Sequence, residues 1–148
     1  MNSVLFACNL NSVRSPMAAA IARHYFGHRL RIDSAGVEAG DLDGFAIAVM
    51  AELGIEIAKY RPKTFDRLIE DEAVFDLVIS LSPEAHHRAL EFARDRPTEV
   101  EYWPTQDPTL ALELGLPREG ILQSYRAVRD TLSERILSRL TQGPVGNL

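Results

Sequence analysis

The sequence predicts an α/β fold: a single domain with an open, twisted parallel sheet of about four strands and helices on both faces. Two observations support this prediction. Short apolar segments of strand character alternate along the chain with segments of helical periodicity, an order typical of parallel sheets. The 148 residues contain no internal repeat, low-complexity segment or linker, and this length suits one domain. We therefore assign residues 1–148 to a single domain.

The first half of the chain is predicted to begin with a buried strand over residues 1–8. A helix follows, with Ser15 as its N-cap and Pro16 in the first position, where no backbone N–H is needed. One face of this helix would carry four apolar or aromatic side chains, namely Ala18, Ile21, Ala22 and Tyr25. A second strand over residues 30–34 closes at Ala35 and Gly36. Helices are predicted over residues 45–53, ending at Gly54, and over residues 64–71, capped by Thr64.

The second half is predicted to begin with a strand over residues 75–81 that is apolar enough to be central. Ser82 and Pro83 start a helix that runs to about Arg94, and residues 100–103 form a shorter strand. The loop over residues 104–117 is long for a compact domain, which favours a functional role. The last helix would end at Gly143 and Pro144, and it carries one apolar stripe: Ile121, Tyr125, Val128, Leu132, Ile136 and Leu140.

Charge and composition argue against several classes of function. The net charge is −5 and no cluster of Lys and Arg is present, whereas a nucleic-acid-binding domain of this size is usually basic. No apolar run approaches the length of a membrane span, and the first residues lack the basic region of a signal peptide. We therefore expect a cytoplasmic protein without a membrane or nucleic-acid partner. Cys8 is the only cysteine, so no internal disulfide can form, and a free thiol suits a reducing compartment.

The segment from Cys8 to Ser15 carries the predicted chemistry. Ligands of open parallel sheets bind beyond the carboxyl ends of strands, where both Cys8 and the loop after Trp103 would lie. A helix N-terminus and the Arg14 guanidinium favour a thiolate, and Arg14 with successive loop N–H groups matches the oxygens of a tetrahedral oxyanion. Asn11 would hold the loop shape and Ser15 would donate to the sulfur. The predicted phosphate-binding residues are Asn9, Leu10, Asn11, Ser12, Val13, Arg14 and Ser15. The alternative is a buried structural cysteine beside a surface arginine.

The segment Cys-Asn-Leu-Asn-Ser-Val-Arg-Ser-Pro-Met-Ala, residues 8–18, resembles the active-site signature of the low-molecular-weight protein tyrosine phosphatase family. Weaker similarities follow in the family's order: residues 33–36 resemble its second strand, residues 75–79 its third, and Asp107 with Pro108 its catalytic acid segment. The resemblance implies phosphomonoester hydrolysis without metal or cofactor, in which Cys8 attacks phosphorus and Arg14 stabilises the oxygens. Asp107 would protonate the leaving oxygen and then activate water. Asp-Pro is also a common turn pair, which leaves a structural role for Asp107 open.

The resemblance also implies the ligands: a phosphorylated protein, a small phosphate ester, or an oxyanion such as phosphate, sulfate or arsenate. The aromatic side chains with which the family grips a phosphotyrosine ring are absent. Glu38 and Asp41 stand in one of these places, where they would disfavour acidic peptides, and Leu110 and Leu112 stand in the other. The substrate is therefore not necessarily a phosphotyrosyl protein.

Two other functions remain open. A related branch of the family reduces arsenate, and its single-chain enzymes pass oxidation to two further cysteines. This chain lacks them, so an external thiol would have to reduce Cys8. The second alternative is a non-catalytic module that binds phosphate, although binding alone needs no nucleophile. His24 and His28 have the spacing of metal ligands, but no carboxylate or cysteine completes a set, so we predict solvated helix residues and no metal site.

Overall fold

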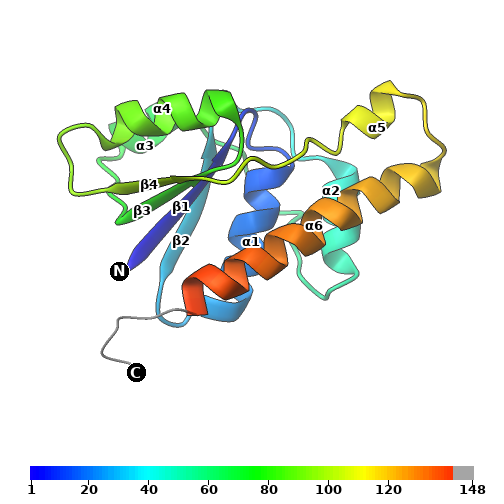
Figure 1. Cartoon of the computed structure of the whole chain (residues 1–148), viewed down its shortest axis with the longest axis horizontal. Coiled ribbons are helices and arrows are strands. Elements are labelled where there is room, and N and C mark those ends of the chain that lie inside the picture. Colours follow the sequence, from blue (N-terminus) through cyan, green and yellow to red (C-terminus); the bar gives the residue numbers. More distant parts are fainter. Residues whose placement is uncertain (142–148) are drawn as a thin grey trace.

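The computed structural model describes residues 1–141 and confirms the predicted parallel sheet (Figure 1). Within these residues the strands are β1 (Ser3–Cys8), β2 (Arg31–Gly36), β3 (Leu77–Ser80) and β4 (Glu99–Tyr102), paired in parallel in the order β2-β1-β3-β4. The chain runs from β1 to β2 on one side and then crosses to β3 on the other. The carboxyl end of β1 is therefore the switch point at which sheets of this kind bind ligands.

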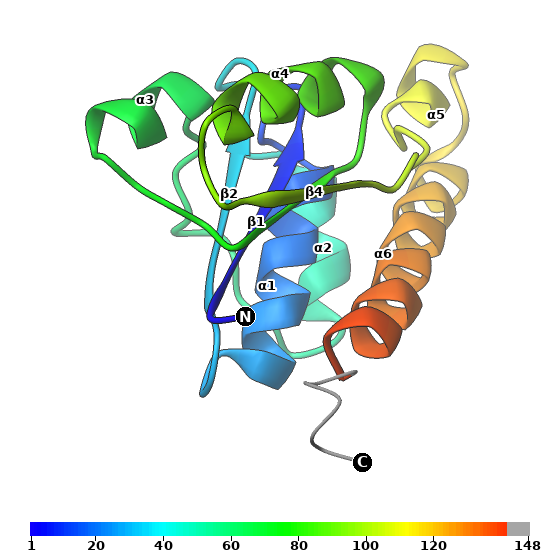
Figure 2. The same cartoon turned by 60° about the vertical axis from the view of Figure 1, so that its left-hand side comes forward.

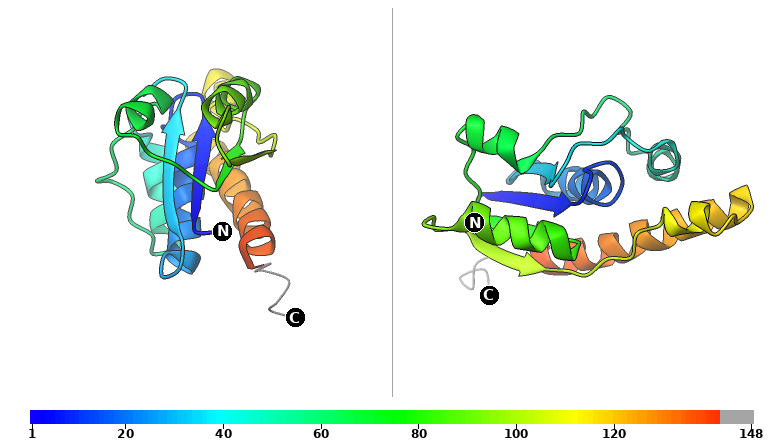
Figure 3. Two further views of the ribbon diagram at one scale, coloured as in Figure 1. Left: turned by 90° about the vertical axis from the view of Figure 1, so that its left-hand side faces the viewer. Right: turned by 90° about the horizontal axis from the view of Figure 1, so that it is seen from above.

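Helices cover both faces of the sheet, as predicted (Figures 2 and 3). One face packs against α1 (Arg14–Phe26), α2 (Gly44–Ala51) and α6 (Arg118–Thr141), and the other against α3 (Phe65–Glu70) and α4 (Pro83–Ala93). From Val4 to Cys8 the side chains of β1 alternate between these two cores, so this stretch is buried on both faces and is apolar throughout. Within residues 1–141, even the 24-residue α6 lacks the uninterrupted apolar length of a bilayer-crossing helix, as do the other helices.

Three helices begin at side chains that accept backbone N–H groups. Thr64 accepts from Arg67, and Ser82 accepts from Ala85 with Pro83 in the first turn, so both predicted starts are confirmed. Asp43 caps α2 by accepting from Phe45 at 2.7 Å and from Ala46 at 3.1 Å. Its second carboxylate oxygen accepts from the buried Tyr125 hydroxyl of α6 at 2.8 Å. The cap therefore also attaches α2 to α6.

The start of α1 differs from the prediction. The helix begins at Arg14, its N-cap is Val13, and no side chain caps it. The prediction of Ser15 as N-cap is wrong because the Ser15 hydroxyl is committed to hydrogen bonds inside the preceding loop. The prediction that Tyr25 lies on the apolar face of this helix is also wrong, because Tyr25 is 45% exposed. Phe26, the last residue of α1, is buried instead. His28 follows the helix in a turn rather than lying on it.

The segment predicted as a long loop contains one more helix, α5 (Leu110–Glu113). This short helix and the first turns of α6 lie at one end of the molecule, away from the strands (Figures 1 and 3). Sequence patterns do not identify it because one helical turn has too few residues to show a period. The predicted helix end at Gly143 and Pro144 lies outside the described residues.

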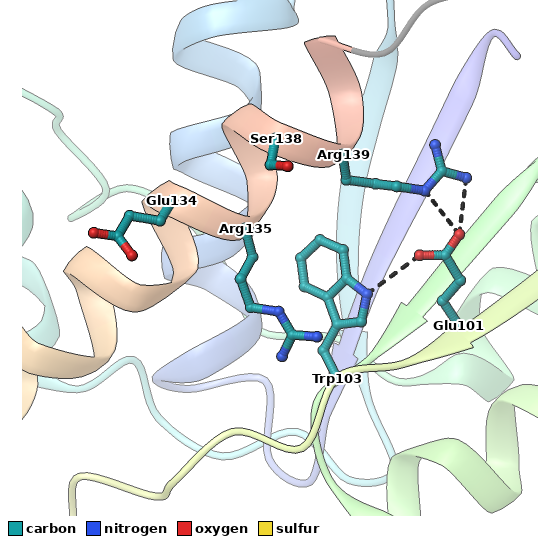
Figure 4. Close-up of a pocket in the computed structure, with 6 residues that line it drawn as sticks. All are labelled: Glu101, Trp103, Glu134, Arg135, Ser138 and Arg139. Carbon is teal, nitrogen blue, oxygen red and sulfur yellow. Dashed lines mark hydrogen bonds and ion pairs between the residues drawn. The ribbon is translucent and has the colours of Figure 1, made fainter.

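Trp103 fixes α6 to the edge of the sheet (Figure 4). Trp103 is 6% exposed, and its ring packs edge-on against Phe6 with the two ring centres 6.4 Å apart. The Arg135 guanidinium lies over the Trp103 ring, 4.7 Å from its centre. Its indole N–H donates to Glu101 at 3.2 Å, and Arg139 donates to the same carboxylate at 2.8 Å. A cavity of about 340 Å³ lies among these side chains. The contact positions the start of the segment that leads to Asp107.

Glu52, just after α2, is clamped by two arginines of α6 and should make stability depend on pH. Arg126 and Arg129 each lie 2.7 Å from its carboxylate. Hydrogen bonds first from Arg126 and then from Arg129 lower the pKa of Glu52 from 4.5 to about 2. A carboxyl group whose pKa is lower in the folded state stabilises the protein at pH values above its unfolded-state pKa. This stabilisation is lost as the pH falls through the folded-state pKa. We expect the urea concentration at the unfolding midpoint to decrease as the pH is lowered below 4.5. In Glu52→Gln this decrease with pH should be less steep.

The control for this prediction is Glu70→Gln, which removes an exposed carboxylate that makes no ion pair within residues 1–141. Its acid profile should match that of the unmodified protein. If the urea midpoint of Glu52→Gln depended on pH as it does in the unmodified protein, the ion pairs of Glu52 would not contribute to the pH dependence of stability.

Candidate active site

Residues 9–13 connect β1 to α1 and form a loop in which most carbonyl groups already accept a hydrogen bond. The N–H groups of Val37, Glu38, Gly40 and Asp43 donate to the carbonyls of residues 8, 9, 10 and 12 at 2.8–3.2 Å. Within residues 1–141, the N–H groups of residues 9–13 donate to no carbonyl, carboxyl or hydroxyl group. A run of free backbone donors beside a helix N-terminus is an anion-binding arrangement.

Two residues make the tight turn of this loop sterically feasible. Asn11 has φ of 53°, in the left-handed region that asparagine tolerates better than most residues. Gly36, at the end of β2, lies directly beneath the loop. A Cβ atom on Gly36 would lie 2.4 Å from the Glu38 carbonyl oxygen and 2.8 Å from the Asn11 nitrogen. Only glycine therefore lets β2 approach the loop this closely.

The Asn11 side chain is fully buried and holds the loop through four hydrogen bonds. Its amide nitrogen donates to Ser15 Oγ at 2.8 Å and to Ser34 Oγ at 3.0 Å. Its amide oxygen accepts from the Tyr60 hydroxyl at 2.5 Å and from the Lys63 backbone N–H at 2.8 Å. Both donors and both acceptor positions of the amide are thus used, and Asn11 fixes the loop shape as the sequence predicted.

The Cys8 sulfur lies 2.9 Å from Ser15 Oγ and accepts the Ser15 backbone N–H at 3.4 Å. Ser15 Oγ accepts a hydrogen bond from Asn11, so its own proton can point to the sulfur at 2.9 Å or to the more distant Ala35 carbonyl at 3.5 Å. Both donors stabilise negative charge on the sulfur more than they stabilise the neutral thiol. The structure therefore places the Ser15 hydroxyl within hydrogen-bond distance of the sulfur, where it could act as the predicted donor.

A cavity of about 250 Å³ opens above Cys8, which is itself only 3% exposed. Most of the predicted site residues line it. The complete lining is Cys8, Asn9, Leu10, Ser12, Val13, Arg14, Glu38, Asp107 and Thr109. Asn11 and Ser15 are not part of the lining, because both residues are fully buried and their side chains make hydrogen bonds on the side of the loop away from the cavity. The lining contains no aromatic side chain, and Leu110, Leu112 and Asp41 do not contribute to it.

Arg14 and Asp107 meet at this cavity although they are far apart in sequence. Arg14 is 8% exposed and donates to the Thr105 carbonyl at 2.9 Å, which attaches the loop after β4 to α1. Its other terminal nitrogen lies 4.0 Å from Asp107 Oδ2. Asp107 Oδ1 accepts from the Thr109 N–H at 3.0 Å and the Thr109 hydroxyl at 2.7 Å. One carboxylate oxygen is thus held in place while the other faces the arginine.

Sequence reasoning missed four residues that shape this site, namely Ser34, Tyr60, Lys63 and Thr109. The spacing of Thr109 from Asp107 is that of a turn in which a carboxylate accepts the N–H two residues later, and this signal was available. Tyr60 and Lys63 lie in the irregular segment between α2 and α3, where no periodicity marks a position. Within residues 1–141, no group of three His, Cys, Asp or Glu residues is arranged to hold a metal ion.

Removing the Tyr60 hydroxyl is expected to loosen the loop without touching the cavity. Tyr60 accepts from Ser34 Oγ at 2.7 Å and from Lys63 Nζ at 3.3 Å while donating to Asn11. We expect Tyr60→Phe to lower the free energy of unfolding by about 1 kcal/mol, because Asn11 loses one buried partner. Alkylation of Cys8 by iodoacetamide at neutral pH should slow a few-fold, since a loosened Ser15 stabilises the thiolate less well.

Tyr25→Phe is the matched control, because Tyr25 is exposed and its hydroxyl makes no hydrogen bond within residues 1–141. A loss of stability in Tyr60→Phe with an unchanged alkylation rate would show that the hydroxyl supports the fold but not the reactivity of Cys8.

Comparisons with known proteins agree with this geometry. The family model for low molecular weight phosphotyrosine protein phosphatase matches residues 3–142. The arsenate reductase of Bacillus subtilis is 32% identical over 135 residues, covering 90% of this chain and 91% of that protein. The glutaredoxin arsenate reductase of Synechocystis is 30% identical over 136 residues, covering 92% and 94%. The solved structure of an arsenate reductase in the phosphate-binding state has a TM-score of 0.75 at 27% identity and covers 96% of this chain and 98% of that one. The chain therefore belongs to the low-molecular-weight phosphotyrosine protein phosphatase family.

Proposed function

We propose that this protein reduces arsenate through a covalent adduct on Cys8, with electrons from an external thiol. The observation that carries the proposal is the setting of Cys8: the chain's only thiol lies at the base of an oxyanion-sized cavity beside Arg14. The names of the curated relatives, which are arsenate reductases at about 30% identity, favour arsenate over a phosphate ester. The absence of aromatic side chains from the cavity lining suits a small inorganic oxyanion.

In the first step the Cys8 thiolate attacks arsenic. An S–As bond forms, and one arsenate oxygen leaves as water after protonation, for which Asp107 is the nearest carboxylic acid paired with Arg14. Arg14 and the free N–H groups of residues 9–13 would hold the remaining oxygens as charge shifts onto them. The roles of Cys8, Arg14 and Asp107 thus remain those that the family resemblance implies.

The second step needs a thiol that this chain does not contain. An external thiolate attacks the Cys8 sulfur, the S–As bond breaks with its electron pair going to arsenic, and arsenite leaves. A mixed disulfide joins Cys8 to the external thiol, and a second thiol releases Cys8 by exchange. The overall reaction converts arsenate and two thiols into arsenite, one disulfide and water, so arsenic gains the two electrons that the thiols lose.

Phosphomonoester hydrolysis is the second candidate, favoured by one feature of the site. Thr109 holds Asp107 Oδ1, and Oδ2 lies on the side of Arg14 in a residue that lines the cavity, an arrangement suited to protonating an alcohol leaving group. Arsenate reduction makes less demand on such an acid, because the leaving oxygen becomes water. The expected intermediate of hydrolysis is a phosphocysteine on Cys8, which water would cleave with Asp107 as base.

The deciding experiment measures both reactions on one preparation. Arsenite formation is followed with glutathione, with and without glutaredoxin, and phosphate release is followed with an aryl phosphate. We expect thiol-dependent arsenite formation, and none in Cys8→Ser. Phosphate release without arsenite would replace the proposal by the second candidate. Phosphate binding without either turnover would identify a non-catalytic binding module.

A further inference from the structure

Glu38 is a carboxylate at the mouth of the cavity. It lines the cavity and is exposed, whereas Cys8 at the base is nearly inaccessible. Its position is fixed by the backbone, because its N–H donates to the Asn9 carbonyl at 2.8 Å and the neighbouring Val37 N–H donates to the Cys8 carbonyl at 3.2 Å. Within residues 1–141, Glu38 makes no ion pair, unlike Asp107, which lies 4.0 Å from Arg14. The mouth therefore carries an uncompensated negative charge.

This charge is unfavourable for binding an oxyanion and needs another explanation. The base of the cavity is electropositive because Arg14 and the loop N–H groups converge there. The mouth is where a second reactant would enter to reach Cys8, because Cys8 lines this cavity and is otherwise almost completely buried. While the reacting atom of a second molecule reaches Cys8, the rest of that molecule remains at the entrance. A carboxylate there attracts molecules with a positive charge on this remaining portion and repels those with a negative charge.

We propose that Glu38 selects the external thiol by charge, favouring aminothiols whose ammonium group lies close to the sulfur and disfavouring thiols with a carboxylate there. This inference rests on the proposed reduction by an external thiol. The reacting sulfur would enter as a thiolate toward Arg14, while its tail remains beside Glu38. An ammonium on the tail would neutralise Glu38, and a carboxylate would be repelled by it.

The size of the effect follows from Coulomb's law. Two unit charges about 6 Å apart in a water-like medium change a rate or affinity about threefold. Reversing the sign of the tail charge doubles this free energy, so cationic and anionic thiols of equal size should differ by about tenfold through Glu38 alone. Because the mouth is solvent-exposed, this ratio should shrink as salt is added.

The primary test measures access to Cys8 without arsenate. Three methanethiosulfonate reagents transfer a small thiol to Cys8 as a mixed disulfide and release methanesulfinate. Their transferred groups carry a trimethylammonium, a methyl or a sulfonate group. Modification is followed by intact-protein mass spectrometry, and the cationic and anionic rates are each divided by the neutral rate. We expect the cationic-to-anionic ratio to fall about tenfold in Glu38→Gln and further in Glu38→Lys.

Asp41→Asn is the matched control, because Asp41 is an exposed carboxylate three residues away that does not line the cavity. Its ratio should stay that of the unmodified protein. An unchanged ratio in Glu38→Gln, or an equal fall in Asp41→Asn, would overturn the proposal, the latter because it would show a general surface field.

The second arm compares cysteamine, 2-mercaptoethanol and 3-mercaptopropionate as reductants of arsenate, each normalised to its thiolate concentration. We expect the order cysteamine, mercaptoethanol, mercaptopropionate, with the spread reduced in Glu38→Gln. A protein that forms no arsenite with any thiol but keeps the Glu38-dependent reagent ratio would refute the proposed function and retain the role of Glu38 at the entrance. Arsenite formation with no dependence on thiol charge would refute the role of Glu38 and retain the function.

Discussion

Arg14→Lys is expected to lower kcat/KM for arsenate reduction and for aryl phosphate hydrolysis by about 10²–10³-fold, the usual cost of losing one preorganised oxyanion donor. Lysine keeps the charge but loses the planar fork that bonds two oxygens at once. It also loses the bond by which Arg14 holds the Thr105 carbonyl at 2.9 Å, so the segment that carries Asp107 would be less well placed. Phosphate binding measured by calorimetry should weaken in parallel with the rate.

The control for Arg14→Lys is Arg61→Lys, an exposed position that does not line the cavity. It should leave both kinetics and phosphate affinity unchanged. A small loss of activity in Arg14→Lys would show that positive charge alone serves the oxyanion and that the loop N–H groups supply the geometry.

The position of the site could be predicted from the sequence because it follows from topology. An apolar strand ending in Cys8, a helix after Arg14 and a long loop after Trp103 suffice to bring Cys8, Arg14 and Asp107 to one edge of a parallel sheet. Neither side-chain packing nor loop conformation enters that argument. The same rule explains why these residues line one cavity although Arg14 and Asp107 lie on different elements.

The supporting contacts could not be predicted, because they depend on which of several competing partners a side chain takes. Ser15 has the residue type and position of an N-cap, yet its hydroxyl bonds Cys8 and Asn11. The sequence contains both options, and only the folded loop decides between them. Tyr60 reaches Asn11 from a segment without regular structure, and no pattern in the sequence specifies such a contact.

The single cysteine and the charged cavity mouth are connected features of the site. A chain with further thiols would resolve its adduct internally and would have no need to recognise a reductant. In the proposed reaction the reductant enters from solvent, and the stretch of residues 37–41, which contains Glu38, has no aromatic side chain. A cavity lined by a carboxylate and by no aromatic side chain suits a small thiol as second reactant better than a phenyl ring.

Asp107→Asn should separate the two candidate reactions. An amide cannot protonate a leaving alkoxide, so we expect kcat/KM for alkyl and poorly activated aryl phosphates to fall by about 10²–10⁴-fold. The dependence of log(kcat/KM) on leaving-group acidity, measured over a series of aryl phosphates, should become steeper. Arsenate reduction should fall less, because arsenate carries hydroxyl protons of its own that can convert the leaving oxygen to water, whereas an ester oxygen has none. Alkylation of Cys8 by iodoacetamide should persist, since Ser15 and the loop remain in place.

The Thr109 contacts provide an independent check on this assignment. Thr109→Val removes the hydroxyl that holds Asp107 Oδ1 at 2.7 Å but leaves the carboxylate itself. Hydrolysis should then fall by less than in Asp107→Asn, with the same steepening of the leaving-group dependence, because a mispositioned acid fails in the same step as a missing one. Asp41→Asn again serves as the control, because it removes an exposed carboxylate that does not line the cavity. If hydrolysis in Asp107→Asn kept its rate and its leaving-group dependence, Asp107 would be the structural turn residue that its Asp-Pro sequence also allows, and another group would have to supply the proton.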